Sequence, residues 1–241
     1  MSSQDTPSYS GERAYRVNTP KQIIENVEDR YRKALQLIDP NDKVLDYGCG
    51  SGIGTEIIAK NCHSVVGYDI DSEQIDENKQ KNEIKDIRYT SDKNELNNEY
   101  DVVTCFEVIE HIPKNSHKEF VENVISRIGS KGTAVFSTPI AYGFAGDSNP
   151  SNPDHTYEYT FCELLDLFSD YGVLNFFDSG ESFCFYIENQ SARDEFTYYK
   201  MFKYYMSLSV NRFASGEMVK GIKYLINSVY ANPICKKWGP K

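Results

Sequence analysis

The stretch from residue 43 to residue 54 constrains the fold more than any other part of the chain. It reads Lys-Val-Leu-Asp-Tyr-Gly-Cys-Gly-Ser-Gly-Ile-Gly, with a glycine at every second position from 48 to 54. Its apolar start predicts a buried strand over 43–46, and the residues after the glycines predict a helix over 53–61. Because glycine has no Cβ and a helix N-terminus offers free N–H groups, a ligand can lie against this backbone. The sequence therefore predicts a cofactor-binding turn between a strand and a helix.

Strands and helices alternate along most of the remaining chain. Apolar runs predict further strands over 64–69, 86–90, 100–106, 133–138, 173–178 and 182–188. Helical spacing of apolar residues predicts helices over 20–38, 72–83, 115–128 and 160–170. Such an alternation is typical of an α/β domain with a mostly parallel sheet and helices on both faces.

Three regions are expected from these patterns. Residues 1–39 comprise a polar arm over 1–20 and a helix, which we expect to act as a lid over a ligand. For the arm, a disordered tail is the alternative. Residues 40–190 form the sheet domain, whose Gly-, Asn- and Pro-rich loop over 140–157 has a length typical of binding loops. Residues 191–241 predict a C-terminal pair of helices, broken at Ser215-Gly216, whose apolar stripe favours core packing or homodimer contact.

Composition narrows the classes of partner. The chain of 241 residues has a formal net charge of −10, which disfavours a nucleic-acid partner. Its six cysteines show no CxxC pair or finger-like spacing. No segment resembles a signal peptide, and no run approaches the ~20 apolar residues that span a bilayer. We therefore expect a cytoplasmic protein without a membrane span.

Two acidic residues bear on the choice of cofactor. An acid at the end of the second strand, Asp69, can accept hydrogen bonds from the ribose of either NAD or S-adenosylmethionine (SAM). Asp46 precedes the glycines, where a pyrophosphate would meet a like charge. SAM instead carries an ammonium and a sulfonium, which a carboxylate favours. The residues therefore favour SAM over NAD.

Three motifs resemble those of class I SAM-dependent methyltransferases. They are the glycine turn, Val-Val-Gly-Tyr-Asp over 65–69, and Tyr-Asp-Val-Val-Thr-Cys-Phe-Glu-Val-Ile-Glu-His over 100–111. The resemblance covers about residues 40–190 and implies a Rossmann-like sheet of seven strands with a reversed last strand. It implies that SAM is bound by Asp46, Gly48, Gly50, Asp69, Ile70, Asp92, Phe106 and, on arm closure, Arg13. For Asp92 the alternative is an ordinary loop aspartate.

A second group of residues predicts the chemical site. Glu107, Glu110 and His111 have i, i+3 and i+4 spacing, so on a starting helix they would share one face beside the methyl donor. Together with His155 they resemble the metal sites of ubiquinone-pathway O-methyltransferases and of small-RNA 2′-O-methyltransferases. That resemblance implies a divalent ion, Mg²⁺ or Mn²⁺, that lowers the pKa of the acceptor hydroxyl. Two alternatives remain: His111 or His155, with Glu107, as catalytic acid–base groups, or a purely structural role. We expect His63 and His117 to be exposed.

The acceptor is the least constrained part of the hypothesis. Acid–base or metal assistance favours a hydroxyl acceptor and hence O-methylation. The arm Ser-Gly-Glu-Arg, Ser137-Thr-Pro, and the segment 152–160 resemble methyltransferases of surface-polysaccharide synthesis, which implies a sugar or glycan hydroxyl. A catechol, a quinone precursor or an RNA 2′-hydroxyl is the alternative. Competing hypotheses are a non-catalytic SAM-fold binding module and an NAD-dependent oxidoreductase.

Overall fold

The computed structural model describes residues 19–141, 146–148, 150–168, 170–177 and 182–188. Seven strands lie in this part of the chain: β1 (Lys43–Tyr47), β2 (Ser64–Tyr68), β3 (Ile87–Thr90), β4 (Tyr100–Phe106), β5 (Ile128–Pro139), β6 (Val173–Phe177) and β7 (Ser182–Glu188). The α-helices there are α1 (Lys21–Ala34), α2 (Ile53–Ala59), α3 (Ser72–Lys81), α4 (His117–Ile125) and α5 (Phe161–Phe168). Short 3₁₀ turns cover Leu35–Leu37, Lys93–Glu95, Ile109–His111 and Lys114–Ser116.

The strands form one sheet in the order β3-β2-β1-β4-β5-β7-β6. The β1–β2, β1–β4, β2–β3 and β4–β5 pairs are parallel, whereas β7 runs antiparallel to both β5 and β6. The predicted seven-stranded, mostly parallel sheet with a reversed last strand is confirmed.

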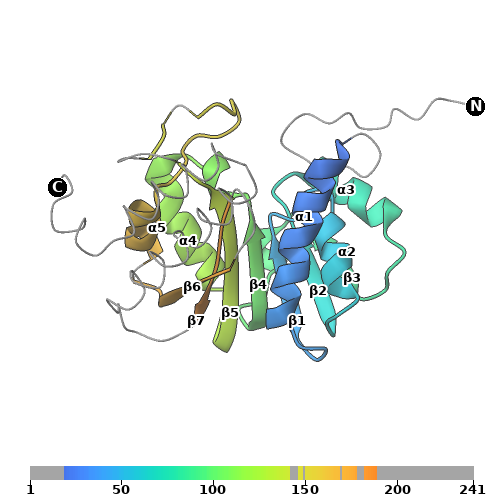
Figure 1. Ribbon diagram of the computed structural model, residues 1–241. Coiled ribbons are helices and arrows are strands. Elements are labelled where there is room, and N and C mark those ends of the chain that lie inside the picture. The colour runs from blue at the N-terminus through green and yellow to red at the C-terminus, as the bar shows by residue number, and fades with distance from the viewer. Residues whose placement is uncertain (1–18, 142–145, 149, 169, 178–181, 189–241) are drawn as a thin grey trace, which may run out of the picture.

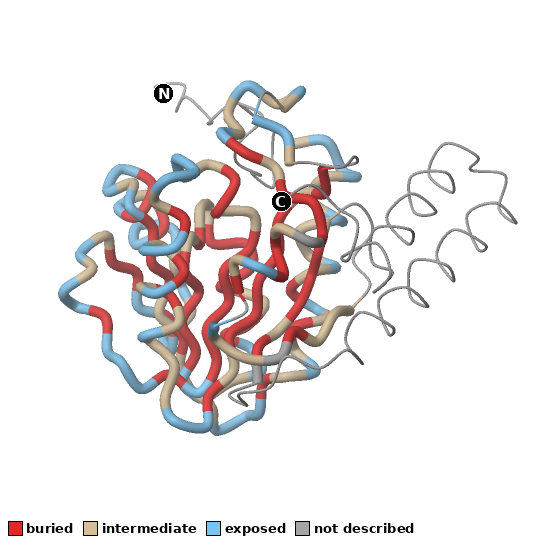
Figure 2. The backbone as a smooth tube through the Cα atoms, turned by 90° about the vertical axis from the view of Figure 1, so that its left-hand side faces the viewer, coloured by how far each residue is buried: buried red, intermediate tan, exposed pale blue. Residues whose placement is uncertain are grey.

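Alternating side chains divide the core into two layers. Val44, Val102 and Val135 pack with α1, α2 and α3 on one face of the sheet. Their neighbours Leu45 and Val103 pack with α4 and α5 on the other. Figure 1 shows the two groups of helices on opposite sides of the strands, and Figure 2 shows the strands buried over most of their length. The predicted helices on both faces, inferred from the alternation of strands and helices along the chain, are confirmed.

The largest difference from the predicted boundaries lies between α4 and β5. The helix predicted over 115–128 ends at Ile125, and β5 begins at Ile128 instead of residue 133, because Ile128 pairs with Tyr100. This early pairing is followed by a register shift between Tyr100 and Val102. A bulged extension of this kind depends on the partner strand, and the local pattern does not encode it.

The strand order reverses between β1 and β4, since β2 lies on one side of β1 and β4 on the other. In open α/β sheets, ligands bind in the crevice outside the carboxyl ends of the strands at such a switch point. The glycine turn follows the carboxyl end of β1, and the Ile109–His111 turn follows β4. The fold therefore brings the predicted cofactor turn and the predicted chemical site to the same edge. In the described part of the chain, no helix is both long and apolar enough to cross a membrane.

Candidate active site

The glycine turn folds back over the end of β2. The N–H groups of Gly48 and Cys49 donate to the carbonyl oxygen of Tyr68 at 2.7 and 2.9 Å. Gly48, Gly50 and Gly52 have φ angles of 80°, 48° and 79°, a region that L side chains avoid. A Cβ on Gly48 would collide with Val108, whereas a Cβ on Gly50 would meet no atom within 4 Å. Gly50 therefore borders open space, as a ligand cradle requires.

Asp69 is fixed at the carboxyl end of β2. Its Oδ2 accepts a hydrogen bond of 2.9 Å from the N–H of Gly50, and its Oδ1 accepts one of 3.0 Å from the N–H of Asp71. Asp71 in turn caps α3 by accepting from the N–H groups of Glu73 and Gln74. The acid predicted to bind ribose is thus oriented by the same turn that borders the open space.

A cavity of about 420 Å³ joins the two predicted sites. Six of the predicted residues line it, namely Gly48, Gly50, Asp69, Ile70, Glu107 and His111. Six other residues complete the lining: Tyr47, Tyr68, Lys93, Val108, Ile112 and Phe120. The sequence analysis missed these six, although all of them except Phe120 directly precede or follow a predicted site residue. The tyrosine rings form an aromatic wall, since Tyr47 lies 4.7 Å from Tyr68 and 5.8 Å from Phe120 between centroids.

Asp46 lies behind the turn rather than in the cavity lining. Its side chain is fully buried and accepts hydrogen bonds from the hydroxyls of Tyr31 (2.9 Å), Thr55 (2.6 Å) and Thr104 (2.8 Å). Burial raises the pKa of Asp46, and the three hydroxyl donors oppose that rise. The position permits an electrostatic influence on a cation at the turn, while direct lining is left to Gly48 and Gly50.

Two other predicted cofactor residues also lie outside the lining. Phe106 is buried, and its ring meets that of Tyr31 at 4.8 Å between centroids. Asp92 is exposed and caps the Lys93–Glu95 turn through the N–H of Asn94 at 2.9 Å. The adjacent Lys93 lines the cavity instead. Arg13 and the predicted helices over 191–241 lie outside the described residues.

Glu107 has an unusual backbone conformation at the end of β4. Its φ of 53° is positive for a non-glycine residue, a strain that concentrates at functional sites. Its Oε1 accepts a hydrogen bond of 2.6 Å from Ser137, and its Oε2 accepts one of 3.0 Å from Ser182. Arg30 of α1 lies 3.8 Å from the same Oε2. Side chains from α1, β5 and β7 therefore hold this carboxylate in the cavity wall.

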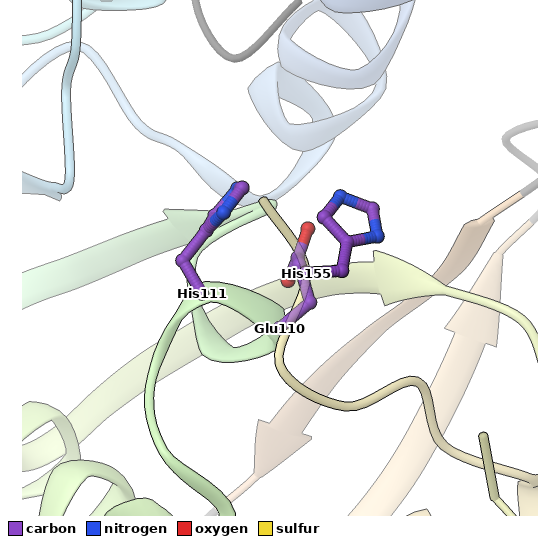
Figure 3. Close-up of side chains that lie close together, drawn as sticks. All are labelled: Glu110, His111 and His155. Atoms are coloured by element: carbon purple, nitrogen blue, oxygen red, sulfur yellow. The ribbon is translucent and has the colours of Figure 1, made fainter. Parts of the chain in front are cut away.

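The structure brings Glu110, His111 and His155 together without Glu107 (Figure 3). One ligand atom from each of the three residues lies within 4.8 Å of the other two. The i, i+3, i+4 prediction for Glu107, Glu110 and His111 is wrong in this respect, because the left-handed residue Glu107 is followed by a 3₁₀ turn, so no α-helix starts there. The Glu107 carboxylate is directed instead to Ser137 and Ser182.

Glu110 is a fully buried acid with one unused oxygen. Its Oε2 accepts a hydrogen bond of 3.2 Å from Thr138, while its Oε1 has no hydrogen-bond partner. Burial raises the pKa of Glu110 well above its usual range, and the charge of Glu107 adds to the rise. An unpartnered buried carboxylate oxygen is costly unless a cation or a proton accompanies it.

Hydrogen bonds assign the tautomers of both histidines. Nδ1 of His111 lies 3.0 Å from the carbonyl oxygen of Asp154, and Nδ1 of His155 lies 2.8 Å from the carboxylate of Glu158. Both partners are acceptors, so Nδ1 carries the hydrogen in each ring and Nε2 carries the lone pair. Figure 3 shows the side chains of Glu110, His111 and His155 close together. One nitrogen of each ring and one carboxylate oxygen of Glu110 therefore lie within 4.8 Å of one another, which is a donor set suited to a divalent ion.

His117 is buried, contrary to the prediction that it is exposed, whereas His63 is exposed as predicted. Nε2 of His117 lies 2.6 Å from the carbonyl oxygen of Ile112, and its Nδ1 contacts the hydroxyl of Tyr159. Burial lowers the pKa of His117, and the charge of Lys114 also lowers it. The residue is covered by the segment around Tyr159, which lies 42 positions away in sequence, so its local pattern does not reveal its burial.

The segments that carry His111 and His155 are joined by their backbones. The N–H of Thr156 donates a hydrogen bond of 2.6 Å to the carbonyl oxygen of Glu110, and the Thr156 hydroxyl contacts the carbonyl oxygens of Glu110 and Ile112. Thr160 then begins α5 with a capping box, because the N–H of Glu163 donates to the Thr160 hydroxyl at 3.4 Å and the N–H of Thr160 donates to Glu163 Oε2 at 3.2 Å.

Residues 19–183 match the family described as "Methyltransferase domain". The chain belongs to this family. The methyltransferase domain thus extends from the residues before α1 into β7, and it contains the glycine turn, Asp69 and the Glu110–His111–His155 cluster. The predicted family is therefore confirmed.

Relatives of the methyltransferase domain include an enzyme named ubiquinone biosynthesis O-methyltransferase from Rickettsia bellii. It is 32% identical over 123 residues, a match that covers 48% of this chain and 48% of that protein. A probable S-adenosylmethionine-dependent methyltransferase from Mycolicibacterium smegmatis is 33% identical over 133 residues, or 54% of this chain and 51% of that protein. The chain therefore spans about half the length of the curated relatives it matches.

Solved structures with the same fold include two complexes with SAH. The DhpI-SAH complex matches with a TM-score of 0.56 and 15% identity over 71% of this chain and 88% of that chain. Magnesium protoporphyrin IX methyltransferase from Synechocystis PCC 6803 with bound SAH matches with a TM-score of 0.55 and 17% identity, over 74% and 90% of the two chains. At this level of identity the likeness shows a common fold.

Proposed function

We propose that the protein is a SAM-dependent O-methyltransferase. The observation that carries this proposal is the continuous cavity of about 420 Å³ whose wall includes Gly50 and Asp69 at one part and Glu107 and His111 at another. Methyl transfer requires a donor site beside a group that assists loss of the acceptor proton. The names of the relatives from Rickettsia bellii and Mycolicibacterium smegmatis support the same reaction class.

The donor side of the cavity fits SAM on observations of this chain. Gly50 leaves open space where a side chain would stand, and Asp69 presents a carboxylate at the end of β2. We assign the ribose hydroxyls to Asp69 and the adenine to the exposed face of Ile70. When bound, SAM supplies an electrophilic methyl group on a sulfonium. The chain's own residues hold that group beside Glu107 and exclude water with the Tyr47, Tyr68 and Phe120 wall.

Residues on the acceptor side of the cavity can accept the proton of the substrate hydroxyl. His111 Nε2 and His155 Nε2 carry lone pairs, so either can accept the proton as general base. Glu107 is fixed by two serine hydroxyls and can accept a hydrogen bond from a second substrate hydroxyl. The assignment gives Glu107 an orienting role and the histidines an acid–base role.

We further propose that Glu110, His111 and His155 hold a divalent ion. The unpartnered Oε1 of Glu110 and the two imidazole lone pairs support this assignment, and they favour Mn²⁺ over Mg²⁺ on ligand type. When bound, such an ion would lower the pKa of the acceptor hydroxyl. It would also compensate the buried charge of Glu110.

For the acceptor, we propose a small molecule with neighbouring hydroxyls, with a sugar or glycan as the first candidate. The acidic net charge of −10 and the resemblance of segment 152–160 to polysaccharide-associated methyltransferases support it. A catechol is the second candidate, because several relatives are named for ubiquinone biosynthesis. An RNA acceptor is disfavoured by the negative charge.

The test begins with binding and proceeds to turnover. Isothermal titration with SAM and, separately, NADH distinguishes the proposed donor from a dinucleotide; no SAM binding at millimolar ligand contradicts the proposal. A methyl-transfer screen then compares sugars, nucleotide sugars, catechols and RNA as acceptors. Full activity in EDTA, together with full activity of Glu110→Gln, would exclude the metal and leave the general-base mechanism.

A further inference from the structure

Glu158 contacts His155 directly but belongs to neither the cofactor turn nor the candidate metal ligands. Its Oε1 lies 2.8 Å from Nδ1 of His155, and the two side chains are only 18% and 12% exposed. The backbone of Glu158 is itself fixed, because it exchanges two hydrogen bonds of 2.9 Å with Asp147 in an antiparallel bridge. A carboxylate on a held backbone can therefore set the orientation of the imidazole.

The opposite side of the His155 ring is also occupied. Asn152 Nδ2 lies 2.9 Å from His155 Nε2, and Asn152 Oδ1 accepts a hydrogen bond of 3.1 Å from the N–H of Asp154. The second bond fixes which end of the amide faces the ring, so the amide N–H₂ donates to the lone pair of Nε2. The lone pair of His155 Nε2 therefore accepts a hydrogen bond from the Asn152 amide, which is a weak, neutral donor.

We propose that Glu158 is a positioning residue that fixes the tautomer and the ring orientation of His155. In the same arrangement, the Asn152 amide donates to His155 Nε2 until an ion or the acceptor hydroxyl binds there. This inference rests on the proposed function, in which His155 Nε2 contacts either the ion or the acceptor hydroxyl. An imidazole can place its lone pair on Nε2 only when Nδ1 carries the hydrogen. Glu158 imposes that arrangement, and a carboxylate behind a histidine also increases the donor strength of the ring.

The role of Glu158 is the same in both versions of the chemistry. An ion needs a lone pair on His155 Nε2 as a ligand, and general-base catalysis needs the same lone pair as a proton acceptor. In either case the Asn152 amide is displaced, at the cost of one neutral hydrogen bond. His111 is arranged differently, because its Nδ1 donates to the backbone carbonyl of Asp154, which no side-chain substitution removes.

The first measurement is the tautomer of His155 in the full-length protein. Imidazole ¹⁵N NMR is recorded about two pH units above the ordinary histidine pKa of ~6.5, where the rings are neutral. The four histidines are assigned by comparison with a His155→Phe variant. We expect the Nδ1–H form in the native protein and in Glu158→Gln, whose amide oxygen can still accept. We expect a mixture of tautomers in Glu158→Ala.

The second measurement is Mn²⁺ binding followed by electron paramagnetic resonance. We expect Glu158→Ala to weaken Mn²⁺ binding by roughly 10- to 100-fold, the usual effect of losing a hydrogen-bond partner behind a metal ligand. Glu163→Gln serves as the matched control, because Glu163 lies in the adjacent capping box and does not contact His155. SAM affinity should be unchanged in both variants.

The outcomes separate this inference from the proposed function. An unchanged His155 tautomer in Glu158→Ala overturns the positioning role of Glu158, whatever the activity of the enzyme. If the native protein binds no Mn²⁺ but Glu158→Ala changes the tautomer and lowers kcat without raising KM for SAM, the metal is excluded and the positioning role stands. If the native protein binds no SAM, the proposed function fails while the tautomer result remains decisive for Glu158.

Discussion

Tyr31 donates a hydrogen bond of 2.9 Å to Oδ1 of Asp46 and thereby ties helix α1 to the strand that precedes the glycine turn. The ring of Tyr31 packs edge-on against Phe106 and covers Gly54, where a Cβ would collide with the ring. The adjacent Arg30 approaches Glu107 to 3.8 Å. One turn of α1 therefore supports both the donor side and the acceptor side of the cavity.

We predict that Tyr31→Phe lowers the free energy of unfolding by about 1–3 kcal/mol, because it leaves the fully buried Asp46 short of one donor while keeping the ring. SAM affinity should also fall, since Asp46 anchors the turn. Urea denaturation and isothermal titration measure the two effects. Tyr171→Phe is the control, because the Tyr171 hydroxyl forms only a longer bond of 3.3 Å to Glu122 near the surface. Equal stability of the two variants would contradict the anchoring role of Tyr31.

Gly50 and Gly52 differ in what surrounds them, although both have positive φ angles. A Cβ on Gly50 enters open space, whereas one on Gly52 comes within 2.6 Å of the Tyr89 hydroxyl. We predict that Gly50→Ala folds with a loss of ~1–2 kcal/mol and loses SAM binding. Gly52→Ala should lose more stability, because Tyr89 must move as well. Thermal denaturation with and without SAM tests both variants. If SAM raises the Tm of Gly50→Ala as much as it raises that of the native protein, SAM does not lie against Gly50.

Asp69 is predicted to contribute charge-assisted hydrogen bonds to the ribose. Asp69→Asn keeps the size of the side chain but removes the charge, so we expect SAM affinity to fall by roughly 10- to 150-fold, equivalent to about 1.5–3 kcal/mol. Asp71→Asn is the matched control, since Asp71 caps α3 and does not line the cavity. Isothermal titration should show a near-native SAM affinity for Asp71→Asn. Similar losses in the two variants would indicate a structural role for Asp69.

The sequence placed the glycine turn and Asp69 beside the cavity more directly than it placed the residues that follow β4. Gly48, Gly50 and Asp69 belong to a strand–turn–helix unit whose geometry is local, so their spacing is sufficient to place them. Asp46 lies in the same motif, yet its three hydroxyl donors come from α1, α2 and β4. The position of Asp46 behind the turn therefore depends on tertiary contacts, which the local sequence does not show.

The acceptor side depends on contacts between distant segments. Glu107 adopts a left-handed backbone conformation that the local sequence does not predict. Its carboxylate accepts a hydrogen bond from Ser182, which lies 75 residues away in sequence. Glu158 was not singled out, because its contact with His155 arises from an i, i+3 spacing within an irregular loop. The mostly parallel sheet was predictable for a different reason, since alternating strand and helix segments imply parallel strands joined by helical crossovers.

His117 should make stability depend on pH below the neutral range. Burial lowers the pKa of His117 from its ordinary value of 6.5, so the unfolded chain binds a proton at a pH where the folded protein does not. Unfolding is therefore favoured as the pH falls through 6.5, and the free energy of unfolding should decrease by up to ~1.4 kcal/mol per pH unit in that window.

His117→Gln retains polar atoms toward Ile112 and Tyr159 but cannot titrate. Urea denaturation between pH 5 and pH 8 should give a shallower pH dependence for His117→Gln than for the native protein, whereas His63→Gln, at an exposed position, should leave the slope unchanged. Equal slopes for His117→Gln and the native protein would show that His117 is not the group responsible.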